Sequence, residues 1–139
     1  MDIRLLKLSD NKGAKDSLTA RDILSIHLGY FYMNGKVTYS TDKAIATQPD
    51  YVILVLGNLP ICYCCHVARY QYGKGAMFKP QHLDFEKYLP DKYKNDSNIS
   101  WLVLDSMKEI PKEFLDAVET NKEVIEFITD RANHKKVGL

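Results

Sequence analysis

The chain has 139 residues, which suits one domain, and it is 45% hydrophobic and 27% charged. This composition is typical of a globular protein and excludes a disordered one. Its 19 basic and 18 acidic side chains leave a net charge of +1, so a polycation that coats nucleic acid is excluded as well. Nucleic-acid binding would need a local basic patch and a shaped pocket.

The first third of the chain predicts two strands around one helix. IRLLKL (Ile3–Leu8) is a strand-like apolar stretch, and a polar loop follows it. SLTARDILSIHLGYFYMNG predicts a helix with Ser17 or Thr19 as its N-cap and the turn signal Asn-Gly at its end. KVTYST (Lys36–Thr41) is rich in β-branched and aromatic residues and predicts a strand.

The middle of the chain predicts a hairpin. DKAIATQPD (Asp42–Asp50) indicates a short helical turn stopped by Pro49. YVILVLG (Tyr51–Gly57) and ICYCCHVARYQY (Ile61–Tyr72) predict two strands joined by a tight turn. The longest apolar run is the first of these strands, which is too short to span a membrane.

The last third begins with a long segment, 73–98, that has four aromatic residues and no clean period. ISWLVLDSM (Ile99–Met107) predicts a strand, and IPKEFLDAVETNKEVIEFITDR (Ile110–Arg131) predicts one or two helices. Strands with helices between and after them predict an α+β fold in a single domain, 1–139. The final residues, ANHKKVGL, match no element, which favours a domain taken from a larger protein.

The cysteines are the first candidates for chemistry. Cys62, Cys64 and Cys65 lie within four residues and are followed by His66. Same-face neighbours on a strand are roughly 6.5–7 Å apart, whereas ligands of one zinc ion lie about 3.5–4 Å apart. A regular strand therefore cannot wrap these side chains around a metal. The spacing favours small apolar side chains in a core strand, and it predicts no metal or other cofactor.

The thiols also bear on location and catalysis. An odd number of clustered cysteines does not form a disulfide framework, and the N-terminus has no signal peptide. We therefore expect a cytoplasmic protein with no membrane partner. A small thiol-dependent enzyme using Cys64 or Cys65 with His66 stays open as an alternative, although adjacent residues of a strand face opposite sides.

The order of several short motifs resembles the YTH and EVE domains of the PUA-like superfamily. They are KLS (Lys7–Ser9), GKVTYST (Gly35–Thr41), CHVARY (Cys65–Tyr70) and ISWLVLDSMKEIP (Ile99–Pro111). The resemblance implies a curved mixed sheet or small pseudo-barrel flanked by helices. Similar domains stand at the N-terminus of McrB-type restriction proteins, which recognise methylated DNA. Tyr39 stands where the family has tryptophan, and the closing motif also differs, which points to a distant bacterial or archaeal relative.

The resemblance implies a non-catalytic module that binds a flipped-out methylated base. Tyr39 would form one aromatic wall, the Ser40 backbone and Thr41 would border the base, and Asp10 or Asn11 would contact a ring nitrogen. The second wall would come from the loop after the hairpin. The candidates for this wall are Phe78 first, then Phe85, Tyr88 and Tyr93, and the phosphate contacts would come from Lys7, Lys74, Lys79 and Arg131.

The same residues could instead have ordinary structural roles. Tyr39 and Trp101 suit core positions, the loop aromatics could cover the sheet, and loop lysines are commonly solvated. The base could be an adenine methylated on its exocyclic amine or a 5-substituted cytosine, and the partner could be RNA instead of DNA. A protein–protein adaptor is the remaining alternative. If the DNA prediction holds, the remaining partners are the other domains or subunits of a restriction complex.

Overall fold

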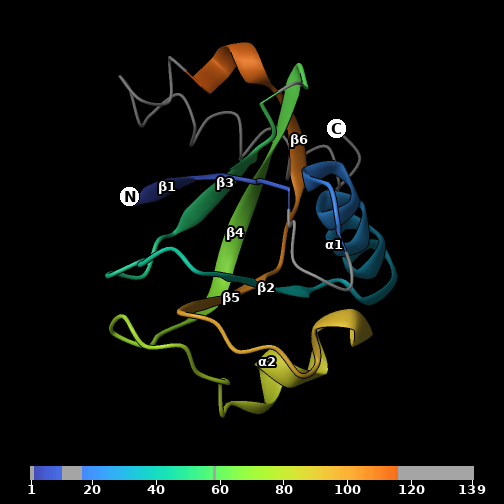
Figure 1. Cartoon of the computed structure of the whole chain (residues 1–139). Coiled ribbons are helices and arrows are strands. Elements are labelled where there is room, and N and C mark those ends of the chain that lie inside the picture. Colours follow the sequence, from blue (N-terminus) through green and yellow to red (C-terminus); the bar gives the residue numbers. More distant parts are fainter. Residues whose placement is uncertain (1, 11–16, 58, 116–139) are drawn as a thin grey trace.

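The computed structural model describes residues 2–10, 17–57 and 59–115 (Figure 1). Its strands are β1 (Ile3–Lys7), β2 (Val37–Thr41), β3 (Tyr51–Val55), β4 (Ile61–Tyr72), β5 (Ser100–Leu104) and β6 (Lys108–Pro111). Its helices are α1 (Ala20–Asn34) and α2 (Leu83–Lys87), with single 3₁₀ turns at η1 (Asp91–Tyr93) and η2 (Lys112–Phe114). The predicted α+β class is confirmed, and the strands form one mixed sheet.

The sheet has the order β1-β3-β4-β5-β2, and β6 pairs with β4 beside this path. β1 and β3 are parallel, and the other pairs are antiparallel. The predicted hairpin is confirmed, because Tyr51 pairs with His66 and Val55 with Cys62. The described sheet is open, with β1 at one edge and β2 at the other.

A bulge in β4 divides the sheet into two halves. Up to His66 the strand pairs with β3 and β6, and from Val67 onward it pairs with β5, with a register shift between Val67 and Arg69. The His66 N–H donates to Ser106 Oγ at 2.8 Å, and the Asp105 N–H donates to the His66 carbonyl at 3.1 Å. Because a bulge bends its strand, the β5–β2 half runs across the β1–β3 half (Figure 1).

Helix α1 is defined at both ends. Thr19 and Asp22 form a capping box, in which each side chain accepts the other's backbone N–H at 3.1 Å. Gly35 ends the helix with a φ of 77°, a conformation that glycine adopts without strain. Leu24, His27 and Phe31 are its buried residues. No helix in the described part of the chain is both long and apolar enough to cross a membrane.

The sulfur-rich strand lies in the core, and its predicted alternation is confirmed. Cys62 and Cys64 pack with Ile53 and Ile110 on one face, while Cys65 belongs to the larger cluster that includes the buried side chains of α1. A third cluster packs α2 against β5, with Trp101 fully buried at its centre. The core interpretation of the tryptophan is therefore correct.

The helical turn predicted for Asp42–Asp50 is wrong, because this segment has no helix. Ser100 Oγ donates to the Lys43 carbonyl at 2.7 Å and accepts the Ile45 N–H at 3.1 Å. The buried Ile45 carbonyl also accepts a hydrogen bond from the Tyr70 hydroxyl. These side-chain partners replace the backbone bonds of a helical turn, which a local pattern could not reveal.

The helix predicted from Ile110 is also wrong at its start. Ile110 and Pro111 belong to β6, where Ile110 pairs with Cys62, and the 3₁₀ turn Lys112–Phe114 comes next. The exposed edge of β4 supplies backbone partners for this segment, and burial of Ile110 stabilises the pairing. The rest of the predicted helix, from residue 116 onward, lies outside the described residues.

The capping box predicts a specific stability difference. Thr19→Ala removes the hydroxyl that accepts the Asp22 N–H, and it should lower the free energy of unfolding by about 1 kcal/mol in urea denaturation. Ser17→Ala is the matched control, since Ser17 is exposed and does not cap the helix, and it should change stability by less than about 0.5 kcal/mol. Equal losses in the two variants would contradict this assignment of the cap.

Candidate functional site

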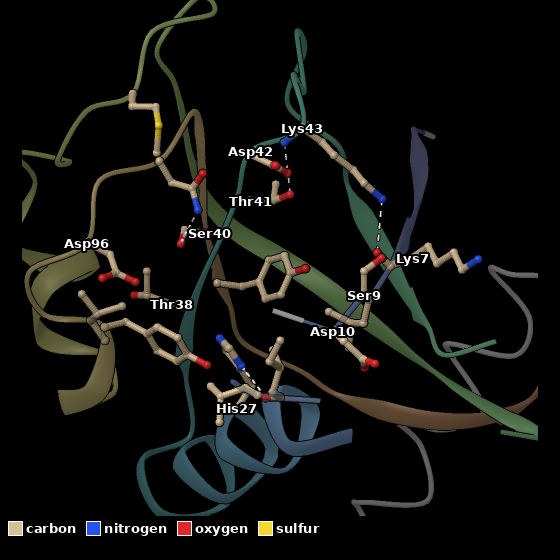
Figure 2. A pocket seen from close by; sticks show the side chains of 18 residues that line it. Lys7, Ser9, Asp10, His27, Thr38, Ser40, Thr41, Asp42, Lys43 and Asp96 are labelled. Carbon is tan, nitrogen blue, oxygen red and sulfur yellow. Dashed lines mark hydrogen bonds between the residues drawn. The ribbon is translucent and has the colours of Figure 1, made fainter. Parts of the chain in front are cut away.

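A cavity of about 610 Å³ lies between the two edges of the sheet (Figure 2). Its lining comes from residues 7–10 at the end of β1, from the start and inner face of α1, from β2 and the two residues after it, from Met77, and from the segment 89–98. Figure 2 shows Asp10 on one side, Asp96 on the other and His27 rising from α1 between them. The volume is typical of a small-molecule or nucleobase site.

Three aromatic rings meet at this cavity. His27 lies 5.2 Å from the Tyr39 ring, tilted by 60°, and 5.3 Å from the Tyr93 ring, stacked at 28°. Tyr39 is 6% exposed and belongs to the core cluster as well as to the lining. Burial is the largest cause that raises the pKa of its hydroxyl, so this group stays neutral in the physiological range. The rings form an apolar, uncharged wall.

The hydrogen bonding of His27 determines what it offers to a ligand. Its Nδ1 lies 2.7 Å from the Ile23 carbonyl, which can only accept, so Nδ1 carries the proton. Burial lowers the pKa of the ring and outweighs the opposing effect of the Ile23 bond. The ring is therefore neutral, and its Nε2 is a hydrogen-bond acceptor at the cavity wall.

The free edge of β2 contributes backbone groups. The Thr38 N–H points away from β5, because it donates to the Tyr88 carbonyl at 2.8 Å. In an antiparallel strand, the backbone groups of Ser40, two residues on, point to the same side. Neither its N–H nor its carbonyl has a partner among the described residues, while its Oγ accepts from Asn98 Nδ2 at 3.1 Å. Ser40 thus presents a donor and an acceptor beside Tyr39.

Tyr93 carries an unsatisfied hydroxyl. Among the described residues it is the one buried side-chain oxygen or nitrogen without a hydrogen-bond partner. Burial and then the nearby Asp96 raise the pKa of this hydroxyl, so it can still donate at neutral pH. A buried polar group left unpaired costs about 1–3 kcal/mol, which a ligand in the cavity would recover in part.

Charged side chains surround the mouth of the cavity. Asp10, Asp42 and Asp96 are acidic, Lys7 and Lys43 are basic, and all five are exposed. Lys43 Nζ donates to the Lys7 carbonyl at 3.2 Å and so links the end of β2 to the end of β1. With three carboxylates and the His27 nitrogen, the site has more acceptors than cations. It suits a ligand that presents N–H groups.

Five of the residues predicted from the motifs line the cavity together with Tyr93, one of the candidates for the second wall: Lys7, Asp10, Tyr39, Ser40 and Thr41. Three of these side chains also accept hydrogen bonds within the protein: Asp10 Oδ1 from the Ala20 N–H at 2.8 Å, Thr41 Oγ1 from the Lys43 N–H at 3.2 Å, and Ser40 Oγ from Asn98 Nδ2 at 3.1 Å. Asp10 therefore helps to fix the start of α1 as well as bordering the cavity.

The other predicted residues lie elsewhere. Phe78 packs against the Trp101 cluster, and Tyr88 lies in the same cluster beneath the ammonium groups of Lys36 and Lys87. Neither belongs to the cavity lining, and Phe85 is buried in the core. Of the four candidates for the second aromatic wall, Tyr93 is the one that lines the cavity. Lys74 and Lys79 are exposed outside the lining, and Asn11 and Arg131 lie outside the described residues.

Sequence reasoning missed His27, Asp96 and Asn98 as lining residues. His27 had a usable signal, because it falls between Leu24 and Phe31 on the buried face of an amphipathic helix. A polar ring at such a position needs partners, which indicates either a core hydrogen bond or a site. Asp96 and Asn98 had no local signal, since they come from a segment without periodicity.

The cysteines do not belong to the lining of this cavity, although Cys65 packs in the same core cluster as Tyr39. All three thiols are free and buried; burial raises the pKa of Cys62 to about 11 and raises that of Cys65 well above its usual value. His66 Nδ1 lies 2.7 Å from Asp105 Oδ1. The described residues contain no group of three or more His, Cys, Asp or Glu side chains placed to hold a metal ion. The thiols have the features of structural rather than activated cysteines.

Comparison with family models, with curated proteins and with solved structures finds no match. The likeness to YTH and EVE domains therefore depends on the sequence motifs, and its functional content belongs to the proposal below.

Thiol burial gives a direct prediction. In the native protein, Cys62, Cys64 and Cys65 should react with a disulfide reagent such as DTNB far more slowly than free cysteine, because all three are buried and burial also raises the pKa of Cys62 and Cys65. In denaturant all three should react at once. One native thiol that reacts at the rate of free cysteine or faster would support the thiol-enzyme alternative.

The neutral state of His27 predicts a loss of stability in mild acid. Below the unfolded pKa near 6.5 the unfolded chain binds a proton that the folded chain excludes, so the free energy of unfolding should fall as the pH drops. Between pH 7.5 and 5.5 this contribution is at most about 1.4 kcal/mol. Urea unfolding at both pH values measures it.

His27→Gln is the comparison for this experiment. The variant should be less stable at both pH values, because it loses the ring contacts, but its change between pH 7.5 and 5.5 should be smaller than that of the wild type. The lowered pKa of Asp22 affects stability only in stronger acid and does not interfere. An unchanged pH dependence in the variant would show that His27 is not the titrating group.

Proposed function

We propose that this protein is a non-catalytic module that binds a methylated base turned out of DNA. It would act in the cytoplasm as the specificity domain of a modification-dependent restriction system, together with the other domains or subunits of that system. The observation that carries the proposal is the combination at β2: a free backbone donor and acceptor on Ser40, next to the aromatic wall of Tyr39, His27 and Tyr93.

The backbone of Ser40 suits the edge of a nucleobase. Adenine and cytosine each place an amino donor next to a ring-nitrogen acceptor on their pairing edge. Such an edge is complementary to one N–H and one carbonyl that point the same way from a strand. The acceptors at His27 and the three carboxylates further favour a base with an amino group over one that presents mostly oxygens.

The remaining surfaces of the cavity suit the faces of the base and a methyl group. Stacking of a base on an aromatic side chain contributes about 1–3 kcal/mol. Apolar lining from Leu8, Ile23 and Leu89 would surround a methyl group, whose burial contributes roughly 0.8 kcal/mol. The Tyr93 hydroxyl would gain a polar partner when the cavity is filled.

Further support comes from the sequence resemblance and from the state of the thiols. The motifs that resemble a PUA-like domain include the β2 segment itself. The open mixed sheet, with a cavity between its edges, is compatible with a base-binding module of this kind. Buried thiols of raised pKa disfavour the alternative of a thiol-dependent enzyme. We therefore infer that the site binds its ligand without transforming it.

The test is fluorescence anisotropy with short labelled oligonucleotides at one fixed salt concentration. The probes are duplex and single-stranded DNA, unmodified, with N6-methyladenine or with 5-methylcytosine, and a methylated RNA. A preference of about tenfold or more for one modified DNA probe is expected, and it names the base. A preference for the methylated RNA would show that the protein reads RNA rather than DNA. Equal affinity for every probe, or none, would overturn the proposal.

The backbone contact predicts a contrast between two substitutions at one position. Ser40→Pro removes the outward N–H without breaking the β2–β5 ladder, because edge strands tolerate proline where the N–H faces away. Affinity for the preferred probe should fall at least about tenfold, which corresponds to one lost hydrogen bond of ~1.4 kcal/mol.

Ser40→Ala is the matched control, since it removes only the hydroxyl that accepts from Asn98 and keeps the backbone N–H. Its affinity should stay within about threefold of the wild type. Circular dichroism and thermal unfolding confirm that each variant is folded. If a folded proline variant binds as well as the alanine variant, the base edge does not contact Ser40.

A further inference from the structure

The loop after β4 presents an exposed apolar side chain at the mouth of the cavity. Met77 lines the cavity, yet its side chain is 61% exposed. A single exposed apolar residue is common on protein surfaces and means little by itself. Met77, however, lies beside the opening through which a base would enter the cavity. Its position there suggests a role in binding.

The loop holds Met77 firmly. The Gly73 N–H donates to the Ile99 carbonyl at 2.9 Å, and Ala76 closes a turn onto the Gly73 carbonyl at 3.1 Å. Phe78 and Asn98 exchange two backbone hydrogen bonds of 2.9 and 3.0 Å, and the Phe78 carbonyl accepts the Trp101 indole N–H at 3.0 Å. Met77 thus lies directly before an anchored residue, so little backbone entropy remains to be lost on binding while its side chain stays mobile.

The same loop carries two cations. Lys74 and Lys79 stand three residues before and two residues after Met77, both are exposed, and neither forms an ion pair with a described residue. Lys74 has a φ of 53°, which places it at the tip of the tight turn. An apolar tip between two free ammonium groups is complementary to duplex DNA, where stacked bases lie between two charged backbones.

A duplex imposes a cost that a single strand does not. When a base leaves the stack, its neighbours lose their stacking contacts and a gap opens between them. Proteins that distort duplex DNA commonly fill such gaps with an apolar side chain, and methionine is one of the residues used. Met77 is unbranched, flexible and adjacent to the cavity that would receive the base, so it can reach the gap while the base is bound.

We propose that Met77 enters the DNA stack at the gap left by the extruded base, while Lys74 and Lys79 contact the phosphates on either side. This inference rests on the proposed function, because it needs a base in the cavity. It adds that the ligand is duplex DNA and that the protein itself stabilises the open duplex.

The test compares one substitution on two probes. Met77→Ala should weaken binding to the preferred modified duplex by about fivefold or more, and it should change binding to the same modified single strand by less than about twofold, because a single strand has no gap to fill. Equal losses on both probes would make Met77 an ordinary part of the cavity wall. No loss on the duplex would also overturn the proposal.

Two controls make the result specific. Leu83→Ala alters another exposed apolar side chain, 78% exposed and outside the lining, and should leave both affinities unchanged. Met77→Leu keeps an apolar tip and should retain most of the duplex affinity. If Met77→Leu is as weak as Met77→Ala on the duplex, filling of the gap is not the function of this residue.

A spectroscopic readout separates this inference from the proposed function. With 2-aminopurine next to the modified base, wild-type protein should raise the fluorescence of the duplex as the stack opens, and Met77→Ala should reduce this rise at saturating protein. Lys74→Ala and Lys79→Ala should each lower the salt dependence of duplex binding by about one counterion. If the wild type prefers the modified probes but Met77→Ala changes neither the duplex affinity nor the 2-aminopurine signal, the proposed reader function stands and the insertion of Met77 is overturned.

Discussion

Strand β4 and its bulge are the constraint on which the rest of the structure depends. The strand pairs with β3 and β6 before the register shift at Val67–Arg69 and with β5 after it, so the two halves of the sheet are joined through this one strand. Because the bulge bends the strand, the sheet edges β1 and β2 do not extend away from each other. They border one cavity, and Lys43 bonds the end of β1. Because β4 is buried on both faces of the sheet, it needs small apolar side chains on each face, and cysteine meets this requirement.

The cavity combines an apolar wall with backbone groups that the fold leaves unpaired. An edge strand normally exposes donors and acceptors to water, and here those of Ser40 lie beside rings whose pKa shifts keep them neutral. Neutral aromatic groups and a peptide edge recognise a flat heterocycle better than a charged ligand. The carboxylates at the mouth restrict the ligand further, because they repel phosphate and accept N–H groups. The phosphate backbone would therefore have to run along the lysines of the loop after β4.

The proposal of binding rather than catalysis depends on a contrast between the cysteines and the groups that line the cavity. The cysteines are conspicuous in sequence, yet they are buried and their thiolates are disfavoured. The groups that can reach a ligand are unremarkable in sequence: a peptide edge, a histidine on a helix and a tyrosine in an irregular segment. These groups can contact a ligand because of where the fold places them, and not because their residue types are unusually reactive.

The sequence by itself determined the strands of the hairpin, the helix that ends at Gly35, and the alternation of Cys62, Cys64 and Cys65, because these follow from local periodicity and turn chemistry. It left the N-cap open between Ser17 and Thr19, and the structure shows Thr19 in this position. It also indicated five lining residues, since β1 and β2 carry recognisable motifs. Only the tertiary structure decided that Ile110 belongs to β6 and that Ser100 bonds the segment after β2. It also decided that Tyr93, rather than Phe78 or Tyr88, borders the cavity. These outcomes depend on partners distant in sequence, whose backbone groups and apolar surfaces meet only after the sheet has bent.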